Sequence, residues 1–153
     1  MFGKTLAEYL KFQRVVLALV VAAFVVRLAL SMAGVANTTA RWISVTVVLL
    51  AGMVYYGVAV YRSGFGSYKQ LYPLMLIQSI VGEGLVALAI ALAILTSRDN
   101  IYTAPEYSGG GDGKNWLHVL AHLVIAGIVL PLVSWAISSL ILLITKKVAP
   151  KTA

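Results

Sequence analysis

Four long apolar stretches dominate the chain and leave few folds open to it. They cover residues 15–36, 43–61, 71–96 and 116–145. Each can cross a hydrocarbon core about 30 Å thick, which takes roughly 20 helical residues. Because lipid offers the backbone no hydrogen-bond partner, each span must be a helix. We predict an all-α membrane protein in which residues 1–153 form one domain, an antiparallel bundle of four transmembrane helices.

The composition agrees with a chain surrounded by lipid. Of its 153 residues, 61% are hydrophobic and 11% are charged, whereas a soluble domain carries about 25% charged residues. Cysteine is absent, which excludes disulfides and thiolate metal sites. The net charge of +7 comes from basic residues at the ends of the apolar stretches, a pattern typical of membrane orientation. We therefore expect membrane lipids as partners and no binding to nucleic acid.

The basic residues also predict an orientation. Eight lie in the two terminal segments and in the connection between the second and third spans, and three lie in the other two connections. By the positive-inside rule both termini are cytoplasmic, and we expect the bacterial cytoplasmic (inner) membrane. The two sets are Lys4, Lys11, Arg14, Arg62, Lys69, Lys146, Lys147 and Lys151, against Arg41, Arg98 and Lys114.

Two segments flank or connect the spans. Residues 2–14 place apolar side chains near one helical face, which predicts a short interfacial helix before the first span. Residues 97–115 form the longest connection, an outer loop with a glycine-rich run at 108–113. We interpret this loop as a connector, with a docking surface for a partner as the alternative.

Glu83 is the acid near the middle of the third span. A charged side chain at the bilayer centre costs about 2.5–3.5 kcal/mol unless it is paired, protonated or hydrated. Arg27 lies about 18 Å from the cytoplasmic end of the first span, and Glu83 lies at a similar depth. We predict that the two form an ion pair, either a structural staple or a proton site and gate. Gly82 and Gly84 would let a backbone or a ligand approach the acid.

The fourth span carries His118 and His122, four residues apart and so on one helical face. The hypotheses for them are hydrogen-bonded or interfacial histidines, ligands of a divalent metal shared with Glu83, axial ligands of haem, or a proton relay. As a straight helix the span would be about 45 Å long. It places the histidines near the outer interface unless tilt, or a kink at Pro131, brings them deeper.

Four further polar residues could line a cavity within the membrane. Tyr55 and Tyr56 lie deeper than the other tyrosines of the cytoplasmic half, and Gln78 and Ser79 precede Glu83 on the third span. The alternative for the tyrosines is an aromatic belt at the membrane interface.

No nucleophile elbow, phosphate loop or acidic metal cluster is present, and we do not expect an enzyme. The first functional hypothesis is a non-catalytic accessory or structural subunit of a larger membrane complex. The second is a homo-oligomeric ion channel or proton-coupled transporter that uses Glu83. The third is a membrane redox protein that holds haem or a metal at His118 and His122.

Overall fold

The computed structural model describes residues 1–149 and contains helices but no strand in that range. Lys151, one of the residues used to predict orientation, lies outside the described residues. In chain order the elements are α1 (Leu6–Met32), α2 (Asn37–Ala40), α3 (Val45–Arg62), α4 (Tyr68–Thr96), the 3₁₀ turn η1 (Pro105–Tyr107), α5 (Trp116–Val124), the π-helical segment η2 (Ile125–Val129) and α6 (Leu130–Val148).

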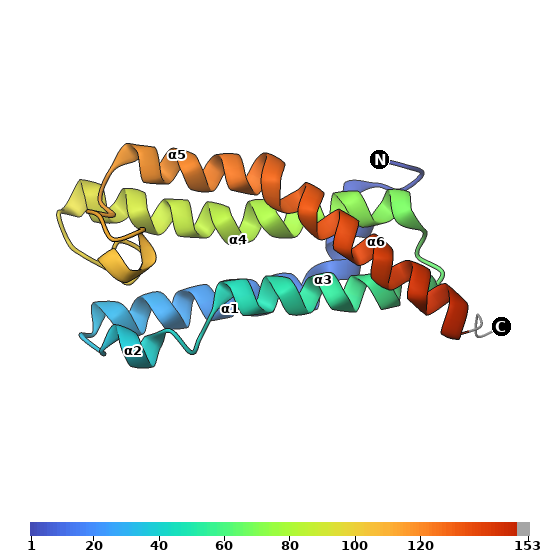
Figure 1. The fold of residues 1–153 in the computed structure, drawn as a ribbon, viewed down its shortest axis with the longest axis horizontal. Coiled ribbons are helices and arrows are strands. Elements are labelled where there is room, and N and C mark those ends of the chain that lie inside the picture. The colour runs from blue at the N-terminus through green and yellow to red at the C-terminus, as the bar shows by residue number, and fades with distance from the viewer. Residues whose placement is uncertain (150–153) are drawn as a thin grey trace.

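Four helical stretches are long and apolar enough to span a membrane, which confirms the predicted all-α bundle and fits an integral membrane protein. The fourth stretch joins α5, η2 and α6. Figure 1 shows the antiparallel arrangement, with the N-terminus and the end of α6 at one end, the termini end, and α2 with the connection after α4 at the other, the loop end. The spans expose large apolar side chains, as expected for faces that contact lipid: Val15, Leu19, Val47, Leu88 and Leu140 are among them.

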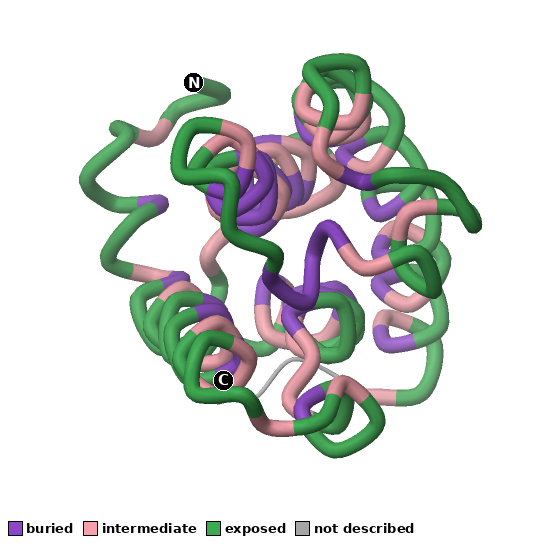
Figure 2. The backbone as a smooth tube through the Cα atoms, turned by 90° about the vertical axis from the view of Figure 1, so that its left-hand side faces the viewer, coloured by how far each residue is buried: buried purple, intermediate pink, exposed green. Residues whose placement is uncertain are grey.

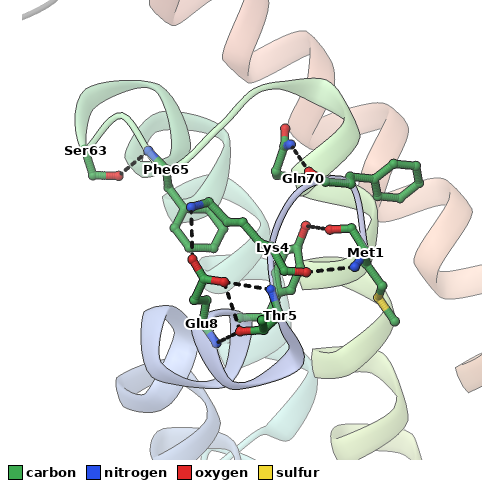
Figure 3. A network of polar contacts seen from close by, with 9 residues as sticks. Met1, Lys4, Thr5, Glu8, Ser63, Phe65 and Gln70 are labelled. Carbon is green, nitrogen blue, oxygen red and sulfur yellow. Dashed lines mark hydrogen bonds and ion pairs between the residues drawn. The ribbon is translucent and has the colours of Figure 1, made fainter.

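The predicted N-terminal helix runs into the first span and forms one element with it. Residues 6–14 contain no glycine or proline and are the first turns of α1, which continues without a break. Thr5 and Glu8 form a capping box, in which Glu8 N donates to Thr5 Oγ1 at 3.2 Å and Thr5 N donates to Glu8 Oε2 at 2.7 Å. Figure 3 shows this network and a hydrogen bond of 2.8 Å from Gln70 to the carbonyl of Phe2, which ties the N-terminus to α4.

The inner helices α3 and α4 hold the bundle together. Both contact α1 and α6, whereas α1 has no contact with α5 or α6 in the described part of the chain. Glycines let neighbouring helices pack closely. A Cβ added at Gly57 would lie 2.7 Å from the side chain of Ile141, and one added at Gly82 would lie 2.9 Å from the side chain of Leu49. In lipid, such close contact stabilises helix pairs where exclusion of water cannot.

An apolar core fills the termini half of the bundle. It joins side chains from α1, α3, α4 and α6, and all of its members are buried. Glu83 follows the core residues Leu71, Leu74 and Met75 along α4, which runs from the termini end to the loop end (Figure 1). Glu83 therefore lies on the loop side of this core. The core consists of Tyr9, Met53, Tyr56, Val60, Leu71, Leu74, Met75 and Leu142.

The fourth span bends where α5 passes into α6, as Figure 1 shows. Pro131 has no N–H, and its ring clashes with the carbonyl four residues earlier. The π-helical turns of η2 come just before this proline and absorb the misfit. As a result α5 runs beside α4 at the loop end, whereas α6 crosses onto α3. The kink predicted at Pro131 is therefore present.

The loop after α4 folds into the bundle. Residues 100–103 are buried, and Figure 2, which looks onto the loop end, shows a buried stretch of loop across the middle of the bundle. Asn100 Nδ2 donates to the carbonyl of Ala89 at 2.9 Å, and Ile101 N donates to Ser31 Oγ at 2.8 Å. This stretch of the loop is therefore fixed to α4 and α1, and is more than a surface connector.

Candidate functional site

Glu83 and His122 form the central contact of the site. Glu83 lies on α4 and His122 on α5, with Glu83 Oε2 2.6 Å from His122 Nδ1. Their side chains are 13% and 21% exposed, so the contact is largely shielded. The bend before α6 lets α5 run along α4, and this carries His122 to the depth of the carboxylate. The two residues, which a straight helix would hold at different depths, therefore meet.

His118 extends this contact toward the loop end. Its Nε2 lies 3.2 Å from Nε2 of His122, and its Nδ1 lies 2.9 Å from the carbonyl oxygen of Gly113. Asn115 caps α5 by accepting a hydrogen bond of 2.8 Å from the backbone N–H of His118, which fixes the start of the helix. The side chains of Glu83, His122 and His118 thus form one hydrogen-bonded chain, which we call the Glu–His–His chain.

The partners in the Glu–His–His chain determine which nitrogens carry hydrogens. A carbonyl only accepts, so His118 Nδ1 must donate to Gly113. If neither Nε2 carried a hydrogen, two lone pairs would face each other at 3.2 Å. A hydrogen bond between the two rings therefore requires one additional proton in the chain, because one Nε2 must donate to the other.

That proton can occupy three positions that keep the same set of hydrogen bonds. It can lie on the Glu83 carboxyl, with His122 as the Nε2–H tautomer. It can lie on His122 as an imidazolium, or on His118 as an imidazolium that donates to His122. The three arrangements contain the same number of hydrogens and keep every hydrogen bond. Moving hydrogens along the bonds converts one arrangement into the next, which is how a proton relay works.

Arg27 does not form the predicted ion pair with Glu83. Three ion pairs occur in the described part of the chain, and Arg27 takes part in none of them. The carboxylate of Glu83 contacts His122 instead. The guanidinium carbon of Arg27 lies 5.1 Å from the ring centroids of both Tyr102 and Tyr107. These are cation–π contacts, which attract the guanidinium electrostatically. The loop supplies a partner for Arg27 that its depth alone could not indicate.

Arg27, Glu83 and His122 nevertheless line one common cavity, of about 170 Å³, which we call the Arg27 cavity. The hydroxyl of Tyr102 is buried there without a hydrogen-bond partner in the described chain. Burial raises the pKa of Tyr102 to about 12, with Arg27 opposing the rise and Glu83 adding to it. The phenol therefore stays neutral at physiological pH and remains a donor. The other residues of the lining are Val45, Thr46, Val86 and Tyr107.

The four residues predicted to line a cavity do not line this one. Tyr56, Gln78 and Ser79 are buried on the termini side of Glu83, and none of them borders the Arg27 cavity. Tyr55 is exposed and borders an apolar groove between α1 and α3. Adjacent residues point about 100° apart on a helix, so Tyr55 is exposed while Tyr56 is buried, although the edges of their rings meet at a centroid distance of 5.2 Å.

A metal shared by Glu83, His118 and His122 does not fit the geometry. No group of three His, Asp or Glu residues in the described chain is placed to hold an ion. Glu83 contacts Nδ1 of His122, while His118 faces Nε2 on another edge of the same ring. The three donor atoms therefore do not converge. Every ring nitrogen also lies within hydrogen-bond distance of another group, which leaves none directed at a haem iron.

Three contributors to the site escaped the sequence analysis: Tyr102, Tyr107 and Gly113. All lie in the connection predicted to be outside the bundle, where no helical periodicity indicates which side chains point inward. The chain matches no protein-family model, and comparisons with curated proteins and with solved structures gave no match. Its function is therefore argued from the geometry of the site.

Proposed function

We propose that this protein is a proton-coupled transporter, or a proton-conducting subunit of a membrane assembly. In this proposal Glu83 binds the proton, and His122 and His118 pass it toward the loop end. There the His118 Nδ1–H leaves the carbonyl of Gly113 and gives its proton to water, because a carbonyl cannot take it. The observation that supports the proposal is the Glu–His–His chain, with contacts of 2.6 Å and 3.2 Å between its three side chains. Buried acids and histidines within membrane spans are the groups that relay protons in pumps and transporters.

A purely structural role explains less of this geometry. A staple between α4 and α5 needs only the contact of Glu83 with His122. His118 lies on the same helix as His122, so their contact adds nothing to the joint between the helices. It does, however, lengthen the chain of titratable groups by one helical turn toward the loop. A relay accounts for that second imidazole.

The packing favours access to Glu83 from one side. Toward the loop end the acid is followed by His122, His118 and the carbonyl of Gly113. Toward the termini end come the buried side chains of Ser79 and Gln78, which do not titrate, and then the apolar core around Leu74. We infer a half path, which suits either one state of a carrier or one subunit of an assembly, including an assembly of several copies. With the basic residues on the cytoplasmic side, protons would enter from outside.

Proton flux into proteoliposomes tests the proposal. The full chain is reconstituted with a trapped pH-sensitive dye and EDTA, and a potassium diffusion potential is imposed with valinomycin. We expect inward proton flux with the wild type and flux at the level of protein-free liposomes with Glu83→Gln. Glu106→Gln is the matched control, because it removes an exposed acid from the connection after α4. It should leave the proton flux unchanged.

A second measurement covers the case in which the half path blocks steady flux. Infrared difference spectra after a pH jump record the carboxylic band that Glu83→Gln lacks. Replacing His118 with Phe should slow the rise of this band at least about tenfold while its amplitude is kept, since the relay is broken but the acid remains. The proposal is wrong if wild type and Glu83→Gln give the same flux and the same difference spectrum.

A further inference from the structure

Arg27 carries a buried charge that no anionic side chain balances. The residue is 8% exposed, takes part in no ion pair with the described residues, and has an Nε without a hydrogen-bond partner among them. Burying an unpaired charge is costly, so such a group usually has a partner. One oxygen of the Glu83 carboxylate, Oε2, contacts His122, and Glu83 forms no ion pair with Arg27. The positive charge of Arg27 is therefore available to a ligand.

The surroundings of the guanidinium indicate the chemistry of that ligand. The faces of the Tyr102 and Tyr107 rings pack against Arg27 and leave its N–H groups to bind elsewhere. Tyr102 lines the same cavity, and its hydroxyl is buried without an acceptor in the described chain. Two residues of the lining, Arg27 and Tyr102, thus each carry a buried donor without an acceptor among the described residues. Donors without an acceptor select an anion.

We propose that the Arg27 cavity binds one small, planar, monovalent oxyanion of the carboxylate or nitrate type. A guanidinium pairs with such an anion through two parallel hydrogen bonds, and the Tyr102 hydroxyl donates a third. The cavity of about 170 Å³ equals roughly six water molecules at about 30 Å³ each, which suits a small anion. A lipid headgroup with its glycerol would exceed it. Anion binding does not depend on whether the Glu–His–His chain moves protons.

Arg41 provides a matched control within the same chain. Its guanidinium carbon lies 5.4 Å from the ring centroid of Trp42, so it also makes a cation–π contact. Arg41 is exposed, however, and solvent can satisfy its N–H groups. It lines no part of the Arg27 cavity. The two arginines therefore differ in burial and cavity but not in charge.

Calorimetric titration with nitrate tests this site. The probe is sodium nitrate, added to the purified full chain in lipid-free detergent without chloride. We expect one nitrate per chain, an affinity at least about tenfold lower for Arg27→Gln, and a smaller loss for Tyr102→Phe, which removes one of three hydrogen bonds. Arg41→Gln should bind as the wild type does.

One further variant and one competitor complete the test. Arg27→Lys keeps the charge but not the planar fork, and should weaken nitrate binding more than chloride binding. It also replaces Arg27→Gln if that variant loses its helical circular dichroism. The proposal is wrong if wild type and Arg27→Gln bind nitrate equally. It is also wrong if an anionic phospholipid in mixed micelles displaces nitrate, because the occupant would then be a lipid headgroup.

Discussion

Replacing His122 with Phe removes the partner of Glu83 and keeps a planar ring. The carboxylate is 13% exposed and loses a hydrogen bond of 2.6 Å. A hydrogen bond to a charged group contributes about 1.5–3 kcal/mol, and an unpaired buried charge costs about 3–5 kcal/mol. Arg27 lines the same cavity and offsets part of this cost. We therefore expect the free energy of unfolding to fall by about 2–3 kcal/mol.

A double-mutant cycle isolates the contact from other effects of the substitution. The variants are His122→Phe, Glu83→Gln and the double mutant, each unfolded reversibly in mixed micelles and followed by circular dichroism. The double mutant has no unpaired carboxylate at position 83, so it should lose less stability than the two single losses added together. We expect a coupling energy of about 2 kcal/mol.

The exposed pair of Asp99 and Lys114 is the control cycle. Its atoms are 2.9 Å apart, but the side chain of Asp99 is 76% exposed. Solvent screening should leave its coupling within experimental error. Equal coupling energies for the two pairs would show that shielding does not strengthen the contact of Glu83 with His122, and would refute the reasoning above.

Two other predictions test the packing and the loop. Gly57→Ala should destabilise the bundle by about 1–3 kcal/mol, because the new Cβ would lie 2.7 Å from Ile141. Gly84→Ala is the control and should not destabilise the bundle, because its Cβ meets no atom within 4 Å. Thermal unfolding compares the two variants. Tyr102 should form its phenolate near pH 12, as ultraviolet absorbance of wild type minus Tyr102→Phe can record. Its pKa is raised from 10 on folding, so the folded protein holds this proton more tightly, and stability should fall as pH rises from 10 toward 12.

The bundle could be predicted because lipid allows so few structures. The length of each apolar stretch determined the number of spans, and the start of α4 at Tyr68 differs from the predicted Leu71 by one turn. At Gly82 the near neighbour is the side chain of Leu49, not the backbone or ligand proposed for this position, and Gly84 has no neighbouring atom within 4 Å. Such details follow from the rotation of each helix about its axis, which hydropathy does not determine.

The site could be predicted only in part. Glu83, His118 and His122 stood out because polar groups are costly in lipid, but their contact depends on the bend at η2. A straight fourth span would have kept the histidines near the interface. Arg27 was expected to pair with Glu83 because both lie deep in the membrane. Instead Arg27 contacts the rings of Tyr102 and Tyr107, which lie in the loop after α4. No periodic sequence pattern indicates that a loop folds inward.

The measurement that tests the Glu–His–His chain most directly is nitrogen NMR of protein labelled with ¹⁵N only in histidine. The chain contains two histidines, so the spectrum reports on this site alone. We expect both Nδ1 atoms to carry hydrogens in the time average, and a scalar coupling between the two Nε2 atoms through the shared hydrogen, lost in Glu83→Gln. Two independent neutral rings with no coupling between their Nε2 atoms would contradict the shared proton on which the proposed relay depends.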